Sequence, residues 1–320
     1  MIENWETINR KTSNGEPFLF VIDYLCKQAI ILDLPIDPNL LLIDFPIYKN
    51  ITSSNIGKLP IKFDKEPILY KDYLQSFNPV IEHLKRGDSF LLNLTHRTKI
   101  SSNLGLKMLF HASKAPYRLF IPGMFTVFSP ETFIRIEDNM ISSFPMKGTI
   151  DASIPNAETV IINDEKETDE HNTIVDLIRN DLNIVAKNVR VKRYRYIDKI
   201  ETNGKTLLQV SSEITGELPE NWKNNFGNIL KSLLPAGSIS GAPKPKTIEI
   251  IDKVEPVKRG FYTGVMGVFD GKNVDSAVMI RFISQTDEGL MYHSGGGITV
   301  NSNPESEYKE LIDKVYVPNS

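Results

Sequence analysis

The sequence contains a single cysteine, Cys26, among its 320 residues. One cysteine can form neither an internal disulfide framework nor a cysteine zinc site. No apolar run approaches the roughly 18 residues that a membrane-spanning helix needs, and the polar start MIENWETINRKTSNG does not resemble a signal peptide. These absences predict a reduced, cytoplasmic protein.

An excess of positive charge is also missing. Lysine and arginine number 37 against 40 aspartates and glutamates, which gives a formal net charge of −3. This balance argues against nucleic-acid binding. Basic residues do gather at 187–195 (KNVRVKRYR), but apolar residues alternate with them, so a solvated strand face is the better interpretation.

What the sequence does contain is a globular composition, 41% hydrophobic and 24% charged. Apolar and β-branched runs predict strands, and apolar residues at helical spacing predict helices. The predicted strands lie at 18–25, 29–34, 40–45, 89–100, 117–144 (a meander), 189–200, 207–218, 261–269, 273–283 and 290–300. The predicted helices lie at 71–85, 104–113, 158–185, 221–234 and 243–254, with a last helix capped by Asn303. Strands that outnumber helices and arrive in runs predict antiparallel sheets with helices outside, an α+β fold.

No linker rich in proline, glycine or asparagine divides the middle of the chain. We therefore expect one continuous domain over 1–320. It would consist of a short N-terminal portion, 1–70, and a core, 71–320, that carries the motifs below.

Lys147 stands at a predicted corner of the chain. The apolar run 139–144 ends at Pro145, whose ring fixes φ, and Gly148 follows the lysine directly. A lysine at such a corner can be aimed into a cleft. The competing interpretation is a solvated surface lysine, the usual fate of a lysine at a strand end.

Two pairs of glutamates share a spacing. Glu167 and Glu170 lie three residues apart on the predicted helix 158–185, and Glu307 and Glu310 repeat this on the last helix. Residues three apart project from one face of a helix. Solvated helix surface is the alternative. If the pairs meet across a cleft, however, they need a hard cation between them, and an oxygen-only donor set with open positions describes a Mg²⁺ site.

Four further features have both a functional and a structural interpretation. Gly295–Gly297 can turn backbone N–H groups toward an anion or form a flexible turn. Arg281, on a predicted apolar strand, can bind a ligand carboxylate or form a structural salt bridge. The loop 234–246 can contact a ligand or be an exposed linker. Glu131 can be an acid catalyst or an ordinary surface carboxylate.

Seven segments occur in an order that is jointly specific. They are SPETF at 129–133, FPMKGTI at 144–150, EHNTIVDLIRNDL at 170–182, PAGSISGAPK at 235–244, RGFYTGVMG at 259–267, AVMIRF at 277–282 and SGGGITVNSNPESEYKELIDK at 294–314. Together they resemble the chorismate-utilising enzymes, above all the large components of anthranilate synthase and aminodeoxychorismate synthase. Isochorismate and salicylate synthases are more distant. The resemblance implies two packed, mainly antiparallel sheets and a chorismate site.

The resemblance also implies a role for each matched position. Glu170 and Glu310 match the family's Mg²⁺ ligands, and Glu167 and Glu307 match the acidic residues beside them. Glu131 matches the general acid/base. Substrate binding is implied for Arg281, Tyr262, Ser238, Lys244, Thr149, Gly295, Gly296 and Gly297.

Lys147 is the position that divides the family. Aminodeoxychorismate synthases resemble this chain in carrying lysine there, whereas anthranilate synthases typically carry alanine. The implied mechanism is covalent: the neutral amine attacks C2 of chorismate, Glu131 protonates the departing C4 hydroxyl, and ammonia then adds at C4. Leu91 aligns with the lysine that activates water in isochorismate-type relatives, and because leucine cannot act as a base, water addition is disfavoured. Gln209 replaces a histidine of the relatives and keeps hydrogen bonding without proton exchange.

Ammonia must come from elsewhere, because Cys26 lacks the glycine-flanked setting of a glutaminase nucleophile. The resemblance therefore implies a separate glutaminase (amidotransferase) subunit as partner. The expected activity is that of aminodeoxychorismate synthase component I, in p-aminobenzoate and folate biosynthesis. Anthranilate synthase component I is the alternative enzyme. A non-catalytic chorismate-binding or regulatory subunit, suggested by Gln209, is the alternative of another class.

Overall fold

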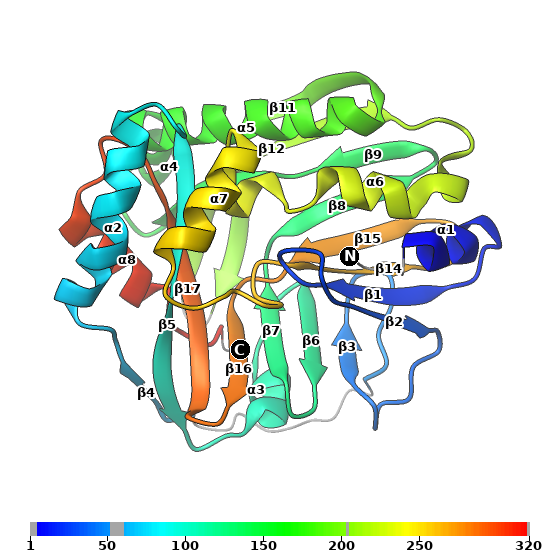
Figure 1. Ribbon diagram of the computed structural model, residues 1–320, viewed down its shortest axis with the longest axis horizontal. Helices are drawn as coiled ribbons and strands as arrows, with labels where there is room; N and C mark the ends of the chain where they lie inside the picture. The colour runs from blue at the N-terminus through cyan, green and yellow to red at the C-terminus, as the bar shows by residue number, and fades with distance from the viewer. Residues whose placement is uncertain (1–4, 52–60, 203–204, 319–320) are drawn as a thin grey trace.

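The computed structural model describes residues 5–51, 61–202 and 205–318. Within these ranges the strands form two sheets, one of nine strands and one of eight, with antiparallel pairing throughout. Strands of one sheet run across those of the other, and helices surround them (Figure 1). The predicted α+β fold of two antiparallel sheets is confirmed.

The nine-stranded sheet has the order β10-β12-β9-β8-β15-β14-β1-β2, with β11 pairing against β12. Its strands are β1 (Phe18–Ile22), β2 (Ala29–Asp33), β8 (Thr132–Glu137), β9 (Met140–Ser143), β10 (Met146–Asp151), β11 (Lys187–Thr202), β12 (Lys205–Glu217), β14 (Val265–Phe269) and β15 (Val274–Val278). The eight-stranded sheet has the order β13-β5-β17-β16-β7-β6-β3, with β4 pairing against β5. It comprises β3 (Leu42–Asp44), β4 (Phe63–Glu66), β5 (Leu91–Ser102), β6 (Tyr117–Ile121), β7 (Phe125–Ser129), β13 (Gly241–Ala242), β16 (Phe282–Thr286) and β17 (Gly289–Ile298).

The helices are α1 (Trp5–Ser13), α2 (Tyr70–Lys85), α3 (Leu106–Ala112), α4 (Ala157–Ile162), α5 (Glu165–Val185), α6 (Phe226–Leu233), α7 (Lys244–Val254) and α8 (Pro304–Asp313). Two short 3₁₀ turns cover Trp222–Asn225 and Gly237–Ile239. The predicted cap of α8 is confirmed, since the Asn303 side chain accepts hydrogen bonds from the N–H groups of Glu305 and Ser306 at 3.0 Å.

Two predicted helices differ from the structure at their N-terminal ends. The segment 158–185 forms two helices, because the side chain of Asp164 caps α5 by accepting from the Glu167 N–H at 2.9 Å. Asn221 makes no side-chain cap, and the 3₁₀ turn Trp222–Asn225 precedes α6. The predicted hairpin turn at 203–204 lies outside the described residues.

The largest apolar core holds α5 in place against the sheets. Ile174, Ile178 and Leu182 of α5 are buried in the same cluster as Trp222 and Phe226. Each large apolar side chain buried in this way contributes about 1.5–3 kcal/mol. Because residues four and eight positions after Glu170 are buried, the face that carries Glu170 points inward. Among the described helices, none combines the length and hydropathy that crossing a bilayer requires.

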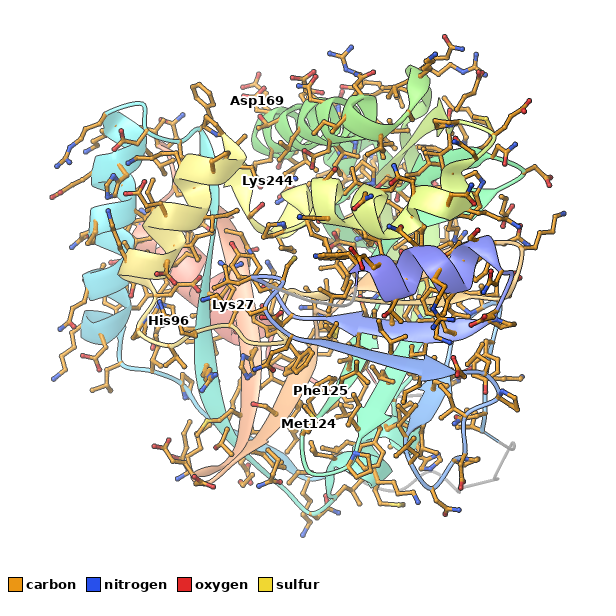
Figure 2. All side chains as sticks on the ribbon, turned by 45° about the vertical axis from the view of Figure 1, so that its right-hand side comes forward. Lys27, His96, Met124, Phe125, Asp169 and Lys244 are labelled. Atoms are coloured by element: carbon orange, nitrogen blue, oxygen red, sulfur yellow. The ribbon has the colours of Figure 1, made fainter. Side chains whose placement is uncertain are left out.

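His96, a buried residue of β5 labelled in Figure 2, makes folding stability depend on pH. It is 6% exposed, its ring lies 5.6 Å from that of Tyr73, and burial lowers the pKa of His96 to about 4. The unfolded chain, with an ordinary histidine pKa near 6.5, therefore binds this proton first as the pH falls. Stability that is present above pH 6.5 is lost on the way to pH 4.

His96→Phe should remove this dependence while keeping a ring against Tyr73. Between pH 6.5 and 4.5 the wild-type chain should lose about 2 kcal/mol more of its free energy of unfolding than the variant does. Urea denaturation at the two pH values measures the difference. The other buried histidines, His171 and His293, are present in both proteins, so they contribute equally to the two losses and drop out of the difference. Equal losses in the two proteins would show that His96 is not the titrating group.

Candidate active site

A cavity of about 810 Å³ opens between the two sheets and the helices α5 and α8. Its walls come from β10, α5, β17, α8, the 3₁₀ turn Gly237–Ile239 and the connection 279–281. This volume suits a small organic molecule. Most of the residues predicted for the site line it: Lys147, Glu131, Arg281, Tyr262, Ser238, Thr149, Gly295, Gly296, Gly297, Glu167, Glu170 and Glu310.

Lys147 is the second residue of β10 and not, as predicted, a corner at a strand end. The positive φ of Gly148, 79°, coincides with a break in the pairing of β10 with β12 between Lys147 and Thr149. Such a bulge re-aims the neighbouring side chain. The Lys147 side chain is 22% exposed, and its Nζ lies 3.2 Å from Oε2 of Glu170.

The three glycines lie within β17, paired to β5, rather than in a turn between strand and helix. A methyl group at Gly297 would stand 3.3 Å from Lys147 Nζ and 3.7 Å from Glu170 Oε2. At Gly296 it would stand 3.6 Å from Glu310 Oε1 and 3.7 Å from an oxygen of Glu307. A side chain at either position would fill the space beside these groups, so glycine keeps the strand backbone open to a ligand.

Glu131 lies between β7 and β8 and faces the cavity. Ser238 Oγ donates a hydrogen bond to its Oε1. Burial raises the pKa of Glu131, and the Ser238 hydrogen bond and the positive charges of Lys147, Lys314 and Arg281 oppose the rise. Glu131 therefore keeps its proton to a higher pH than an exposed glutamate, as a general acid must.

Arg281 does not lie on the predicted strand. It occupies the connection between β15 and β16 with a φ of 53°, which is uncommon for a residue with a side chain. Its guanidinium stands 4.9 Å from the centre of the Tyr316 ring. Among the described residues no carboxylate pairs with it, so the structure does not support the salt-bridge interpretation and leaves a partly buried cation facing the cavity.

Lys314 also lines the cavity, although its motif did not point to it. Its Nζ lies 2.5 Å from Glu310 Oε1 and donates to the carbonyl oxygen of Gly295 at 2.9 Å, and burial lowers the pKa of Lys314. Its position four residues after Glu310 could have predicted this, because that spacing places both side chains on one helix face. Further lining residues that were not assigned are Asn93, His293, Lys309 and Tyr316.

Two predicted residues do not line the cavity. Lys244, at the start of α7 (Figure 2), pairs with Asp181 at 2.8 Å and donates to the carbonyl oxygen of Leu233 at 3.0 Å. Glu307 is 4% exposed and accepts a hydrogen bond from Ser302 Oγ at 2.8 Å. The glycine–serine loop reaches the cavity through Ser238 and Ile239 instead.

The glutamate oxygens that line the cavity are ligands of the kind that a hard cation prefers. Within the described part of the chain, no three histidine, cysteine or acidic side chains stand close enough to hold a metal ion by themselves. Mg²⁺ commonly takes only one or two protein carboxylates, together with water and substrate oxygens. Glu170 and Glu310 line the cavity from two helices and are the two carboxylates that such a site would use.

The chain is similar to known proteins over most of its length. Residues 45–319 match the family model described as chorismate binding enzyme. The chain belongs to this family. It is 50% identical over 98% of its length to an uncharacterized PabA-like protein of Haemophilus influenzae, covering 95% of that protein. A protein of the chorismate binding family is expected to act on chorismate, so the cavity is a candidate chorismate site.

Members of the family with named activities are less similar. The chain is 34% identical to aminodeoxychorismate synthase component 1 of Salmonella typhimurium, over 76% of this chain and 56% of that protein. It is 31% identical to anthranilate synthase component 1 of Saccharolobus solfataricus, over 82% and 64%. The chain thus spans less than two thirds of these proteins. The menaquinone-specific isochorismate synthase of Escherichia coli shares the fold, with a TM-score of 0.74 at 16% identity over 96% of this chain and 79% of that one.

Proposed function

We propose that this protein is the chorismate-binding component of an aminodeoxychorismate synthase and converts chorismate and ammonia to 4-amino-4-deoxychorismate, the precursor of p-aminobenzoate in folate biosynthesis. The observation that carries the proposal is a nucleophile and an acid in one cavity, the Lys147 amine and the partly buried Glu131 carboxyl. The 34% identity to an aminodeoxychorismate synthase component 1 supports it.

In the first step, the neutral Lys147 amine attacks C2 of the substrate ring. The two ring double bonds shift toward C4, the C4–O bond breaks, and Glu131 gives its proton to the departing hydroxyl, which leaves as water. The adduct is a secondary ammonium joining Lys147 to C2, and Glu131 is now a carboxylate.

In the second step, ammonia adds at C4 and the double bonds shift back. The C2–N bond breaks, and its electron pair returns to Lys147 as a neutral amine. The new C4 ammonium gives a proton to Glu131, which restores the starting enzyme. The sum is chorismate plus ammonia to aminodeoxychorismate plus water.

Positive charge and hydrogen-bond donors in the cavity suit a dianionic substrate. Arg281 provides a guanidinium without a carboxylate partner in the described structure, and Gly296 and Gly297 line the cavity with it. A planar guanidinium binds a carboxylate through two hydrogen bonds. We assign the ring and enolpyruvyl carboxylates of chorismate to these groups and to the position between α5 and α8.

We also propose that Mg²⁺ binds between Glu170 and Glu310, with Glu167 and Glu307 adding negative charge. When bound, it would neutralise and orient a substrate carboxylate. Turnover should then fall below detection in EDTA and return with added Mg²⁺. Glu170→Gln should raise the Mg²⁺ concentration for half-maximal turnover by about tenfold or more. Full activity in EDTA would contradict the metal site, and Asp169→Asn, on the exposed side of α5, is the control.

The ammonia is proposed to come from a separate glutaminase subunit. Burial raises the pKa of Cys26 to about 12, so its thiol is not ionised near neutral pH and is a poor nucleophile. The purified chain should therefore turn over chorismate with ammonium salts but not with glutamine. Turnover with glutamine alone would contradict a separate subunit.

Anthranilate synthase component I is the second candidate, because a relative of that name is almost as similar. A single experiment separates the two. Chorismate, ammonium and Mg²⁺ are incubated with the chain and the product is identified by mass spectrometry and fluorescence. We expect aminodeoxychorismate, which yields p-aminobenzoate only after a lyase is added. Fluorescent anthranilate formed with no lyase would identify the other enzyme, and no turnover would favour a non-catalytic role.

A further inference from the structure

Arg259 is a buried arginine that does not line the cavity, yet each of its N–H groups points to an acceptor. Nε and Nη2 donate to the two carboxylate oxygens of Glu255 at 2.9 and 2.6 Å. Nη2 also donates to the carbonyl oxygen of Asn93 at 2.6 Å, and Nη1 to that of Ile239 at 2.8 Å. A longer contact of 3.4 Å joins Nη1 to Thr263 Oγ1. The guanidinium thereby uses all five donors.

Glu255 completes this network from its other side. Its Oε1 also accepts the N–H of Thr95 at 2.9 Å. The side chains of Arg259 and Glu255 are only 2% and 4% exposed, and the Tyr24 ring covers the guanidinium, with its centre 4.5 Å from Cζ. A pair so deeply buried holds its geometry, because moving either partner would leave a charge without compensation.

Besides Glu255, the acceptors of Arg259 belong to three separate segments of the chain. Asn93 lies on β5, Ile239 ends the 3₁₀ turn Gly237–Ile239, and Thr263 follows Tyr262. Each segment also places a side chain on the cavity wall, namely Asn93, Ser238 and Tyr262. The Ile239 carbonyl additionally accepts from Asn93 Nδ2 at 3.2 Å, so both of its lone pairs are used.

We propose that Arg259, held by Glu255, is a positioning residue that fixes the turn Gly237–Ile239 so that Ser238 donates its hydrogen bond to the catalytic carboxyl of Glu131. Ser238 is adjacent to Ile239, and its Oγ reaches Glu131 Oε1. Arg259 touches neither Glu131 nor the space for substrate. Its effect on catalysis passes through Ile239 and Ser238, and its kinetic consequences rest on the proposed function.

Arg259→Lys separates this role from simple charge pairing. A lysine keeps the positive charge beside Glu255, but its single nitrogen lacks the planar fork that reaches Asn93 and Ile239 together. The turn then loses its anchor, and Ser238 no longer donates reliably to Glu131. We expect kcat to fall at least about tenfold while KM changes less than about twofold.

The pH profile supplies a readout that a purely structural role would not change. The groups that face Glu131 are Ser238, Lys147, Lys314 and Arg281, and all lower its pKa. Loss of the Ser238 hydrogen bond removes one lowering influence, so the limb of the kcat–pH profile that reports Glu131 should move to higher pH in Arg259→Lys. The carboxyl C=O infrared band of Glu131, assigned by its absence in Glu131→Gln, should persist to higher pH as well.

Arg118→Lys is the matched control. Arg118 also pairs with a carboxylate, that of Asp44, and donates to two carbonyl oxygens, those of Phe110 and Ser113 at 3.2 and 2.6 Å. It is not among the residues that line the cavity. Its replacement should lower the melting temperature without changing kcat or the pH profile. If Arg259→Lys does the same, Arg259 is only structural and the inference is wrong.

Glu255→Gln covers the case in which Arg259→Lys fails to fold. Glutamine keeps one oxygen and gives up one bond to Arg259, so kcat and the pH limb should change in the same direction by a smaller amount. Unchanged values in the folded variant would overturn the inference. The infrared band of the Glu131 carboxyl can be recorded on a chain that does not turn over chorismate. A wild-type chain that is inactive on chorismate thus contradicts the proposed function, whereas an unshifted Glu131 band in Arg259→Lys contradicts the role of Arg259.

Discussion

Lys147→Ala is expected to lower kcat for chorismate with ammonia by at least about a thousandfold. The amine forms the first covalent bond of the proposed reaction, and Lys147 Nζ stands 3.3 Å from where a methyl group on Gly297 would lie. Removing a nucleophile leaves only binding and polarisation to catalyse the reaction. Steady-state rates with saturating ammonium, followed by coupling to a lyase, measure the loss.

Two further variants show whether nucleophilicity or charge is responsible. Lys147→Arg keeps a positive charge near Glu170 but cannot supply a neutral amine at ordinary pH, so it should be as inactive as the alanine variant. Lys309→Ala removes an exposed lysine of α8 that also lines the cavity and should lower kcat by no more than a few-fold. Turnover in Lys147→Ala within tenfold of wild type would exclude the covalent step.

Glu131→Gln should have the next largest effect, a fall in kcat of about 10²–10⁴. Glutamine has nearly the same shape and can still accept from Ser238, but it cannot give a proton to the departing C4 hydroxyl. Because burial raises the pKa of Glu131, the wild-type acid keeps its proton to higher pH, and activity that depends on this proton declines as the pH rises through that pKa. The variant should lack this decline.

The control for Glu131 is Asp313→Asn, which neutralises an exposed carboxylate at the cavity edge. It should alter kcat by less than about threefold and leave the pH profile in place. A Glu131→Gln variant with kcat near wild type and the same alkaline limb would mean that another group protonates the leaving hydroxyl. KM in both variants should stay within a few-fold, since neither side chain is assigned to bind a substrate carboxylate.

Local sequence signals predicted the elements that position most of this site. The cap at Asn303 and the apolar residues Ile174 and Ile178 fix α8 and α5, and with them the sides on which Glu310 and Glu170 lie. Such signals work because capping and helical spacing act over a few residues. The family resemblance, rather than these signals, assigned most of the individual roles.

Features that depend on distant contacts could not be predicted in this way. The φ of Arg281 is stabilised by neighbours from other strands, as in the hydrogen bond from the Phe128 N–H to the Arg281 carbonyl at 3.0 Å. Lys244 is drawn from the cavity by Asp181, a residue 63 positions away. The acceptors of Arg259 are likewise brought together only by the complete fold. No local pattern contains these pairings.

The most direct test is to map the covalent adduct. The chain is incubated with chorismate and Mg²⁺ without ammonia, quenched in acid and digested, and the peptide masses are recorded. We predict a mass increase equal to chorismate less one water on the peptide that contains Lys147, absent from Lys147→Ala and discharged by ammonium before quenching. A wild-type chain that makes aminodeoxychorismate from ammonia yet carries no such mass on Lys147 would contradict the account.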